Sequence, residues 1–211
     1  MRCYICKESM QKFLNDKTNI YFYHCNSCEF VCKEPSLYQD IELQKERYDL
    51  HENSAHSEGY RAYFQRFLDF TLPLVGSPKN ALDFGCGESC LLASMLKEKN
   101  IECDYYDPIY HPKTLQSNSK YDLIVTTEVF EHLHKPQEVF NMLLEHLNDG
   151  GYLAIQTEFH PNNTELFKKW YYHLDPTHIV FFRAKSFEVL AKLHNTKLIA
   201  DNGKNMLVIK K

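Results

Sequence analysis

The chain has 211 residues, of which 44% are hydrophobic and 25% are charged, and its formal net charge is -4. This composition is typical of a globular protein, and the acidic balance argues against a broad basic surface for nucleic acid. No run approaches the ~20 apolar residues that span a bilayer, and the start of the chain lacks the apolar core of a signal peptide. We therefore expect a cytoplasmic protein whose eight cysteines are thiols or metal ligands rather than disulfides.

Two Cys-x-x-Cys pairs lie near the start of the chain. Cys3 and Cys6 are separated by 18 residues from Cys25 and Cys28, a spacing typical of paired zinc knuckles. Four thiolates fill a tetrahedral shell, so we expect a structural zinc site rather than a catalytic one. Because residues 1–35 are too few to hold a core alone, the metal would supply folding energy.

This N-terminal segment has alternative interpretations. The cysteines could be unrelated buried thiols, or the nearby His24 or Cys32 could belong to the ligand set. We favour the four cysteines because their spacing is regular. A ribbon that binds RNA is a further alternative, but residues 1–35 carry five Lys/Arg against four Asp/Glu, which is a poor electrostatic footprint for nucleic acid.

Residues 36–78 are predicted to form a helical linker or cap. The first part is polar, and the stretch from Glu42 to Leu50 is compatible with a helix. Apolar residues then recur at i, i+3, i+4, i+7 and i+8, which predicts an amphipathic helix packed on a core. These residues are Tyr60, Tyr63, Phe64, Phe67 and Leu68, and Gly76 and Pro78 follow the helix.

From residue 79 onward, short apolar runs alternate with amphipathic segments. Strands are predicted at Asn80–Phe84, Glu102–Tyr106, Tyr121–Thr127 and Tyr152–Thr157. Helices are predicted at Cys90–Lys97, from Pro136 to Leu147, and from a Ser186 cap through His194. Strands with intervening helices indicate a parallel α/β sheet.

Two features modify that pattern. Asn202-Gly203 lies between the strand-like runs Lys197–Ala200 and Met206–Ile209, which is a strong hairpin signal, so the last strand should be antiparallel. Only 13 residues separate Asp107 from Tyr121. That is hardly enough for a helix and a strand with their turns, so we expect a reduced third-strand region.

The first strand of this domain ends in a glycine turn, Gly85–Gly87, where bare backbone can approach a ligand. Asp107 ends the second strand, where a carboxylate can accept hydrogen bonds from both ribose hydroxyls. Taken alone, Asp107 before Pro108 would be interpreted as a turn residue. Together with the glycine turn, the ribose role is favoured. A nicotinamide fingerprint needs Gly or Ala where Cys90 stands, which argues against a dinucleotide.

These features resemble the class I S-adenosylmethionine-dependent methyltransferases over residues 80–211. The resemblance lies in the first motif Leu82–Gly87, in Asp107, in Tyr121–Leu133 and in the turn Leu147–Leu153. The whole chain also resembles a bacterial group that has a zinc ribbon fused in front of this domain. The resemblance implies an α/β fold with a Rossmann-like methyltransferase sheet. It divides the chain into a ribbon (1–35), a linker or cap (36–78) and a methyltransferase domain (79–211).

The resemblance also implies a site for S-adenosylmethionine. Asp83 would orient the glycine loop, the loop backbone would line the methionine moiety, and Glu128 would lie beside the donor. The implied cofactor-binding residues are Asp83, Gly85, Cys86, Gly87, Asp107 and Glu128, with Arg47 and His51 capping the donor from the N-terminal side. Glu88-Ser89 departs from the family's small-residue pair, and the short third-strand region removes an acid that often contacts the adenine amine.

Methyl transfer from a sulfonium mostly needs positioning in a site free of competing water, and a base is needed only if the acceptor loses a proton. The base candidates are Glu131, His132 and His178. His178 ends an aromatic loop, Trp170–His178, that should overhang the carboxyl edge of the sheet. The alternatives are that this loop only packs and that Glu131-His132 only begins the connection to the next helix.

We therefore expect a methyltransferase with a small-molecule acceptor, and RNA or protein remain alternative acceptors. One competing interpretation is a zinc-ribbon module that binds RNA or protein and carries an inactive methyltransferase-like domain. The retained glycine turn and acidic residues argue against it. A nicotinamide oxidoreductase is disfavoured by Cys90 and by the final hairpin.

Overall fold

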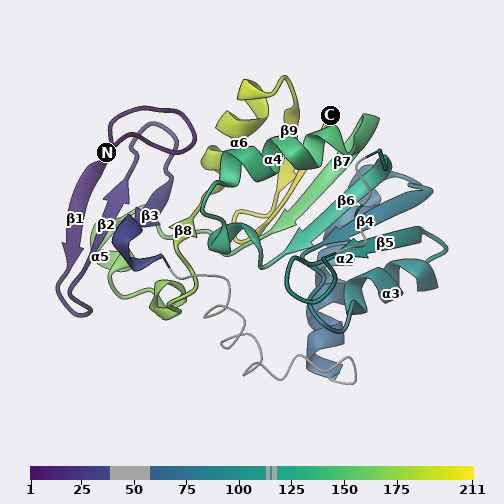
Figure 1. Ribbon diagram of the computed structural model, residues 1–211, viewed down its shortest axis with the longest axis horizontal. Coiled ribbons are helices and arrows are strands. Elements are labelled where there is room, and N and C mark those ends of the chain that lie inside the picture. Colours follow the sequence, from purple (N-terminus) through teal and green to yellow (C-terminus); the bar gives the residue numbers. More distant parts are fainter. Residues whose placement is uncertain (39–57, 113–114, 116–117) are drawn as a thin grey trace.

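The protein contains two β-sheets, one of six strands and one of four (Figure 1). The computed structural model describes residues 1–38, 58–112, 115 and 118–211. The helix considered for Glu42–Leu50 and the donor-capping roles considered for Arg47 and His51 lie outside these residues.

The six-stranded sheet has the order β5-β4-β6-β7-β10-β9. Its strands are β4 (Asn80–Phe84), β5 (Glu102–Tyr106), β6 (Tyr121–Thr127), β7 (Leu147–Gln156), β9 (Lys197–Asp201) and β10 (Met206–Lys210). The first four strands in this order are parallel, and β10 runs antiparallel to both β7 and β9. The predicted Rossmann-like sheet with an antiparallel last strand is confirmed.

Strand β7 begins earlier than the sequence pattern predicted. Leu147 pairs with Tyr121, and the register then shifts before Leu123 pairs with Tyr152. Gly150 takes a positive φ of 77° in this stretch. The Asn-Asp-Gly-Gly sequence therefore forms an irregular start of the strand rather than a separate turn.

Helices cover both faces of this sheet. Successive residues of a strand point to opposite faces, and in the central strands the residues on both faces are apolar and buried. One face packs on α2 (Glu58–Val75) and α3 (Leu91–Glu98), and the other on α4 (Pro136–Glu145) and α6 (Ala184–Leu193) (Figure 1). In β6, for example, Leu123 and Val125 belong to the first core and Ile124 to the second. No described helix is both long and apolar enough to cross a membrane.

The region between β5 and β6 is short, as the spacing predicted. Its described residues contain no strand, and the chain reverses through an isolated antiparallel bridge between Asp107 and His111. This reversal places residue 111 beside the end of β5, close to the glycine turn.

The four-stranded sheet contains β1 (Gln11–Asn15), β2 (Ile20–His24), β3 (Val31–Lys33) and β8 (Val180–Phe181), paired antiparallel in that order. The first three strands come from the N-terminal segment. Strand β8 comes from the far part of the chain, and its two residues pair with Val31 and Cys32. The sequence pattern did not predict this pairing. Short helices lie at Pro35–Leu37, Phe130–His132, Thr164–Phe167 (α5) and Tyr171–Leu174.

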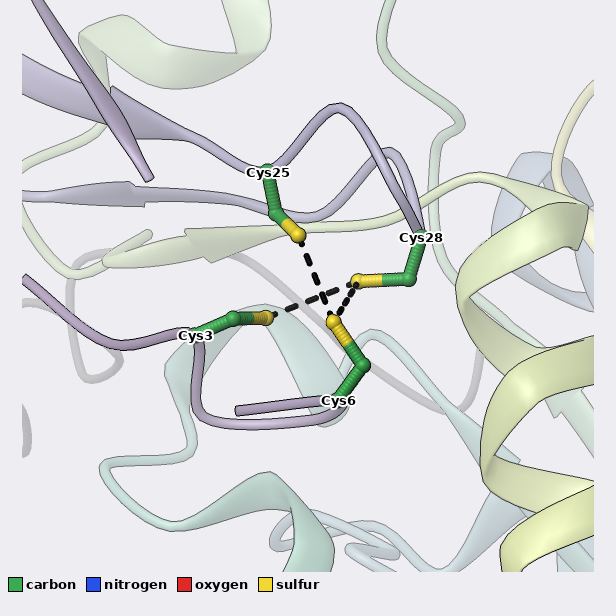
Figure 2. A group of neighbouring side chains, drawn as sticks. All are labelled: Cys3, Cys6, Cys25 and Cys28. Carbon is green, nitrogen blue, oxygen red and sulfur yellow. Dashed lines mark hydrogen bonds between the residues drawn. The ribbon is translucent and has the colours of Figure 1, made fainter. Parts of the chain in front are cut away.

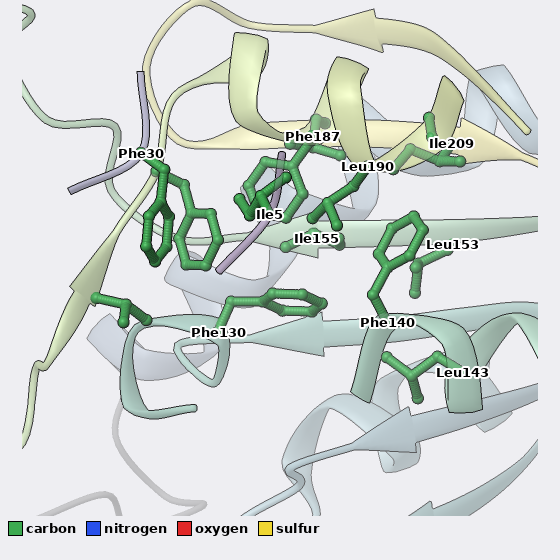
Figure 3. Close-up of a cluster of buried hydrophobic side chains, with 14 of the residues drawn as sticks. Ile5, Phe30, Phe130, Phe140, Leu143, Leu153, Ile155, Phe187, Leu190 and Ile209 are labelled. Carbon is green, nitrogen blue, oxygen red and sulfur yellow. The ribbon is translucent and has the colours of Figure 1, made fainter. Parts of the chain in front are cut away.

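The N-terminal segment packs on the main domain through a continuous apolar core (Figure 3). The Phe30 ring lies 5.3 Å from the Phe182 ring, which in turn lies 4.8 Å from the Phe187 ring of α6. Ser186 adds a polar link, because its hydroxyl donates to the Cys28 carbonyl at 2.8 Å. Ser186 is the third residue of α6 rather than its N-cap, and Arg183 occupies the N-cap position.

Candidate active site and metal centre

The glycine turn lies at the carboxyl edge of the parallel strands, next to the end of β5. The amides of Gly85 and Cys86 donate to the Tyr106 carbonyl at 2.8 and 3.2 Å. Gly85 has a φ of 83°, and a Cβ there would come within 2.2 Å of the Val129 side chain. Gly87 has a φ of 63°, and a Cβ there would meet nothing within 4 Å. Gly85 is therefore needed for packing, whereas Gly87 borders open space.

Asp83, the fourth residue of β4, ties this strand to the helix that follows the turn. Its side chain is buried, and Oδ2 accepts a hydrogen bond from the Ala93 amide in the first turn of α3 at 3.1 Å. Burial raises the pKa of Asp83 to about 7, and the Asp107 carboxylate adds to the rise. Asp83 thus holds the two ends of the glycine loop in place.

Asp107 contacts the glycine turn directly. Its Oδ2 accepts from the Gly87 amide at 3.1 Å, and its Oδ1 accepts from the amides of Ile109 and Tyr110 at 2.8 and 3.0 Å. The residue therefore closes the turn after β5, as the simpler interpretation held. The same carboxylate joins the glycine turn to the turn after β5.

Gln156, at the end of β7, is a site residue that the sequence reasoning missed. Its side chain is 1% exposed, and neither Oε1 nor Nε2 has a partner among the described residues. Buried amides are normally hydrogen-bonded, so both polar atoms of this side chain can take a partner. The Gln156 carbonyl accepts from the Glu128 amide at 2.9 Å, which places it at the carboxyl edge. No local signal separates this glutamine from any other strand residue.

An S-adenosylmethionine molecule fits this set of groups. The open backbone at Gly87, the acceptor carboxylate of Asp107 and the unpartnered amide of Gln156 lie along one edge of the sheet. They offer partners for an amino acid moiety and for ribose hydroxyls.

Glu128 follows β6 directly and is held from two sides. Its carboxyl group accepts from the Tyr63 hydroxyl of α2 at 2.7 Å and lies 2.8 Å from the Tyr172 hydroxyl. Its φ is 53°, a strained conformation for a residue other than glycine and one that is often found at functional sites. Burial raises the pKa of Glu128 to about 8, and neighbouring Glu131 adds to the rise. The helical pattern of α2 predicts a core position for Tyr63, but its hydroxyl reaches Glu128.

Glu131 is fully buried beside Glu128. One oxygen of Glu131 lies 2.5 Å from the Tyr172 hydroxyl, and the other accepts from the Thr157 hydroxyl at 2.8 Å. Burial raises the pKa of Glu131. Because the Tyr172 hydroxyl has one proton, it can donate to one of the two carboxyl groups and accept from the other when that group is protonated.

His132 and His178 are each oriented by a backbone carbonyl. Nδ1 of His132 donates to the Thr177 carbonyl at 3.0 Å, and Nε2 lies 3.9 Å from Oε1 of Glu131. Nδ1 of His178 donates to the Tyr172 carbonyl at 2.8 Å. Burial and His132 lower the pKa of His178 to about 3, so its ring stays neutral.

The three predicted base candidates therefore lie together. The polar atoms of Glu131, His132 and His178 are within 4.8 Å of one another, and the two imidazole rings are 4.8 Å apart. Glu131 and His132 follow β6, whereas His178 comes from the loop after β7. This group combines proton acceptors with a buried carboxylate at the edge where the cofactor fits.

The four N-terminal cysteines also converge (Figure 2). The Sγ distances are 3.5 Å for Cys3–Cys28, 3.4 Å for Cys6–Cys25 and 3.6 Å for Cys6–Cys28. A tetrahedral zinc ion with Zn–S bonds of about 2.3 Å has sulfur–sulfur edges of about 3.8 Å. The four thiols therefore have nearly the separation that such an ion requires, and Cys32 and His24 lie outside this group.

The two Cys-x-x-Cys turns have the same local geometry. The residue after the second cysteine has a positive φ in each turn, 64° at Lys7 and 58° at Glu29. Its amide donates to the carbonyl of the first cysteine, at 3.2 Å in one turn and 2.8 Å in the other. Two copies of one turn thus aim four thiols at a common centre.

Strand β3 connects this centre to the active-site loop. The buried Nζ of Lys33 donates to the Asp175 carbonyl at 2.6 Å, and the Lys33 amide donates to the Ile179 carbonyl at 2.8 Å. Burial lowers the pKa of Lys33 to about 8. The N-terminal segment therefore holds both ends of the stretch that contains His178.

Comparison with known proteins identifies the main domain. A family model described as a methyltransferase domain matches residues 55–200. The chain belongs to this methyltransferase family. Together with the Rossmann-like sheet, this makes the protein an S-adenosylmethionine-dependent methyltransferase. No curated protein matches the sequence.

Solved methyltransferases share the fold. The plantazolicin methyltransferase BpumL, in complex with a monoazolic desmethylPZN analog and SAH, is 14% identical, with a TM-score of 0.50 over 83% of this chain and 92% of that one. An O-methyltransferase family protein from Burkholderia thailandensis has a TM-score of 0.53 and 14% identity over 80% and 62% of the two chains. A putative O-methyltransferase from Nostoc punctiforme has a TM-score of 0.51 and 11% identity over 71% and 56%. The methyltransferase thus spans less than two thirds of these last two proteins.

Proposed function

We propose that this methyltransferase transfers the sulfonium methyl group of S-adenosylmethionine to a small-molecule acceptor that loses a proton in the reaction. The observation that carries this proposal is the convergence of Glu131, His132 and His178 from two separate segments. A second part of the proposal is that the four N-terminal cysteines hold a structural zinc ion.

The cofactor would be held along the carboxyl edge of the sheet. The residues assigned to it are Asp83, Gly85, Cys86, Gly87, Asp107 and Glu128, joined by Gln156. S-adenosylmethionine supplies a methyl group that is already activated by its sulfonium. Asp107 accepts three backbone hydrogen bonds, and a carboxylate has about four acceptor positions, so one remains for a ribose hydroxyl.

His132 is the proposed proton acceptor. Because Nδ1 donates to the Thr177 carbonyl, Nε2 carries the lone pair that can take a proton. Glu131 lies 3.9 Å from this nitrogen and would stabilise the imidazolium that forms. His178 stays neutral and would form the wall of the site beside it. This arrangement supports an acceptor whose O–H, N–H or acidic C–H bond is broken during methyl transfer.

The surface around this group favours a small acceptor over RNA. Tyr171 is 65% exposed and Leu174 60% exposed, next to the loop that contains His178. Charged side chains of the N-terminal segment form ion pairs, including Lys12 with Glu34 at 2.9 Å. Apolar groups at the rim and neutralised charges suit an organic molecule better than a phosphate backbone.

The zinc proposal depends on the donor set. Four thiols from two equivalent turns leave no open coordination position, so the ion would contribute folding energy and no chemistry. Quantification of zinc in the purified protein tests this directly. One zinc per chain that is lost in Cys25→Ser is the expected result.

Labelling tests the acceptor class. The protein is incubated with methyl-labelled S-adenosylmethionine and cell extract, and the label is fractionated after nuclease and protease treatment. We expect the label in small molecules that resist both treatments. Label that becomes soluble only after nuclease or protease would assign the acceptor to RNA or protein and overturn the proposal.

Substitution tests the base. His132→Ala should lower the rate of methyl transfer by ~10²–10⁴, the usual contribution of a positioned base. Calorimetry should show S-adenosylhomocysteine binding unchanged and no binding of NAD. His134→Ala, an exposed histidine two residues away, is the matched control and should keep full activity. An unchanged rate in His132→Ala would exclude it as the base.

A further inference from the structure

A pair of thiols lies inside the cofactor loop. The Sγ atoms of Cys86 and Cys90 are 3.4 Å apart. Cys86 is buried, whereas Cys90 is only partly buried. It precedes α3 in a left-handed conformation with a φ of 47°, which is unfavourable for a residue other than glycine. Neither the packing nor the proposed reaction explains a strained cysteine at this position.

His111 lies beside this pair because the chain reverses after β5. The Asp107–His111 bridge returns the backbone toward the glycine loop, and the His111 amide donates to the Asp107 carbonyl at 2.9 Å. The His111 ring contacts the Tyr105 ring at 5.0 Å, and Nε2 lies 3.2 Å from the Glu88 carbonyl. These contacts orient the imidazole toward the loop.

The three side chains bring their polar atoms to one point. One ligand atom from each of Cys86, Cys90 and His111 lies within 4.8 Å of the others. Two thiolates and an imidazole are a known donor set for zinc with an open fourth position.

Two carboxylates border the group. Asp107 accepts from the Gly87 amide at 3.1 Å, one residue after Cys86, and Asp83 accepts from the Ala93 amide at 3.1 Å, three residues after Cys90. Negative side chains beside the group attract a positive ion.

We propose that Cys86, Cys90 and His111 form a second metal site, for a thiophilic divalent cation such as Zn²⁺ or Cd²⁺. Binding forms two metal–thiolate bonds and one metal–imidazole bond, and both thiol protons are released to solvent. The fourth position stays open for water. The site is separate from the four N-terminal cysteines, with which it shares no ligand.

The location of this site links it to the cofactor. A bound ion would tie the glycine loop to the loop after β5, with Asp107 between them. Cys86, a ligand of this ion, is also one of the residues assigned to the cofactor in the proposed function, so the ion and S-adenosylmethionine should oppose each other. Such coupling is reciprocal: each ligand must weaken the other by the same factor.

Cadmium titration of the reduced, zinc-loaded protein tests the proposal. Calorimetry and thiolate-to-cadmium absorption should show one cadmium bound per chain, without release of the zinc already present. Cys90→Ser and His111→Ala should each weaken cadmium binding by more than about 100-fold, because even the loss of an outer-shell partner costs 10–100-fold. Cys103→Ser, which removes a buried thiol of β5 outside this group, should bind cadmium like wild type.

Two outcomes would overturn the proposal. One is the absence of cadmium uptake beyond exchange with the existing zinc. The other is equal cadmium affinity in wild type, Cys90→Ser and His111→Ala, with circular dichroism showing that all three are folded. The antagonism is tested by S-adenosylhomocysteine calorimetry at rising cadmium concentration. Its apparent Kd should rise in wild type and stay constant in Cys90→Ser.

Discussion

The two sheets of this methyltransferase are stabilised in different ways. The six-stranded sheet has helices on both faces and packs between two apolar cores. The four-stranded sheet has three short N-terminal strands, converging thiols and one strand borrowed from the main domain. A segment this small cannot bury enough surface by itself. It is therefore stable only as part of the larger molecule.

The borrowed strand has a consequence for the active site. The chain between β7 and α6 contains Tyr172 and His178, and the N-terminal segment holds it at several points. Asn15 donates to the Lys168 carbonyl at 3.2 Å, and Lys33 donates to the Asp175 carbonyl at 2.6 Å. The four-stranded sheet therefore positions the loop that contains His178, whereas the six-stranded sheet contains the glycine turn proposed to bind the cofactor.

The largest expected effect follows from the proposed N-terminal zinc site. Structural zinc contributes apparent free energies of about 10–16 kcal/mol in isolated fingers, so Cys25→Ser should unfold the four-stranded sheet. Hydrogen exchange should become fast in β1, β2, β3 and β8 and stay slow in β4, β6 and β7. Cys32→Ser, a buried thiol outside the cysteine group, is the matched control. If the amides of β8 stayed protected from hydrogen exchange in Cys25→Ser, the four-stranded sheet would not depend on the four cysteines as proposed.

Phe30→Ala tests the apolar contact between the two regions. The ring is fully buried against Phe182, and a buried Phe→Ala change usually costs about 3–5 kcal/mol. Urea denaturation should show that loss within a single transition, because the core is continuous. Phe13→Ala, at a partly exposed ring of β1, should cost less. Two separate transitions in the wild-type protein would show that the regions unfold independently.

Lys33→Met tests the buried amine that holds the active-site loop. Burial lowers the pKa of Lys33 from 10.5 to about 8, so between these values the unfolded chain binds more protons at this position than the folded chain. Stability that depends on Lys33 is therefore lost as pH falls from 10.5 to 8. At about 1.4 kcal/mol per pKa unit, the wild type should gain on the order of 3 kcal/mol relative to Lys33→Met as pH rises from 8 to 10.5.

Urea denaturation at the two pH values measures this difference. Lys17→Met removes an exposed lysine of the same segment and should show no such dependence. The same pH dependence in wild type and Lys33→Met would mean that the amine is not buried as described.

Ser186→Ala should have the smallest effect. The hydroxyl donates to the Cys28 carbonyl at 2.8 Å and accepts from the Arg183 amide at 3.2 Å. Its removal should cost about 1–2 kcal/mol, the range for a helix cap and a buried hydrogen bond. Thermal unfolding measures the loss, and Ser94→Ala on exposed α3 surface is the control. If Ser186→Ala lost as much stability as Phe30→Ala, polar groups would contribute as much as apolar packing to the contact between the N-terminal segment and the main domain, contrary to this prediction.

Much of the six-stranded sheet was predictable because its signals are local. Asn80–Phe84, Glu102–Tyr106 and Tyr121–Thr127 are apolar runs bounded by glycine, proline or polar residues, and the structure has strands with these same bounds. The antiparallel ending followed from Asn202-Gly203. The glycine turn and Asp107 were recognisable because a strand–turn–helix pattern puts such residues at one edge.

Contacts between distant segments were not predictable. Strand β8 has only two residues, too few for a periodic pattern, and it forms because Val31 and Cys32 present an unpaired edge. Gln156 has no sequence signature, because the absence of a hydrogen-bond partner is a property of its surroundings. Likewise, Glu131 and His132 are adjacent in sequence, but His178 joins them only through the loop held by Lys33.

The sequence by itself determined the fold family, the positions of the central strands, the four-cysteine set and the residues of the glycine turn. Each depends on spacing along the chain, which local backbone geometry converts directly into structure. Only the tertiary structure decided that the N-terminal sheet takes a strand from the main domain, that three base candidates meet, and that Cys86, Cys90 and His111 lie together. These depend on which surfaces pack against each other, and packing of distant segments leaves no periodic trace in the sequence.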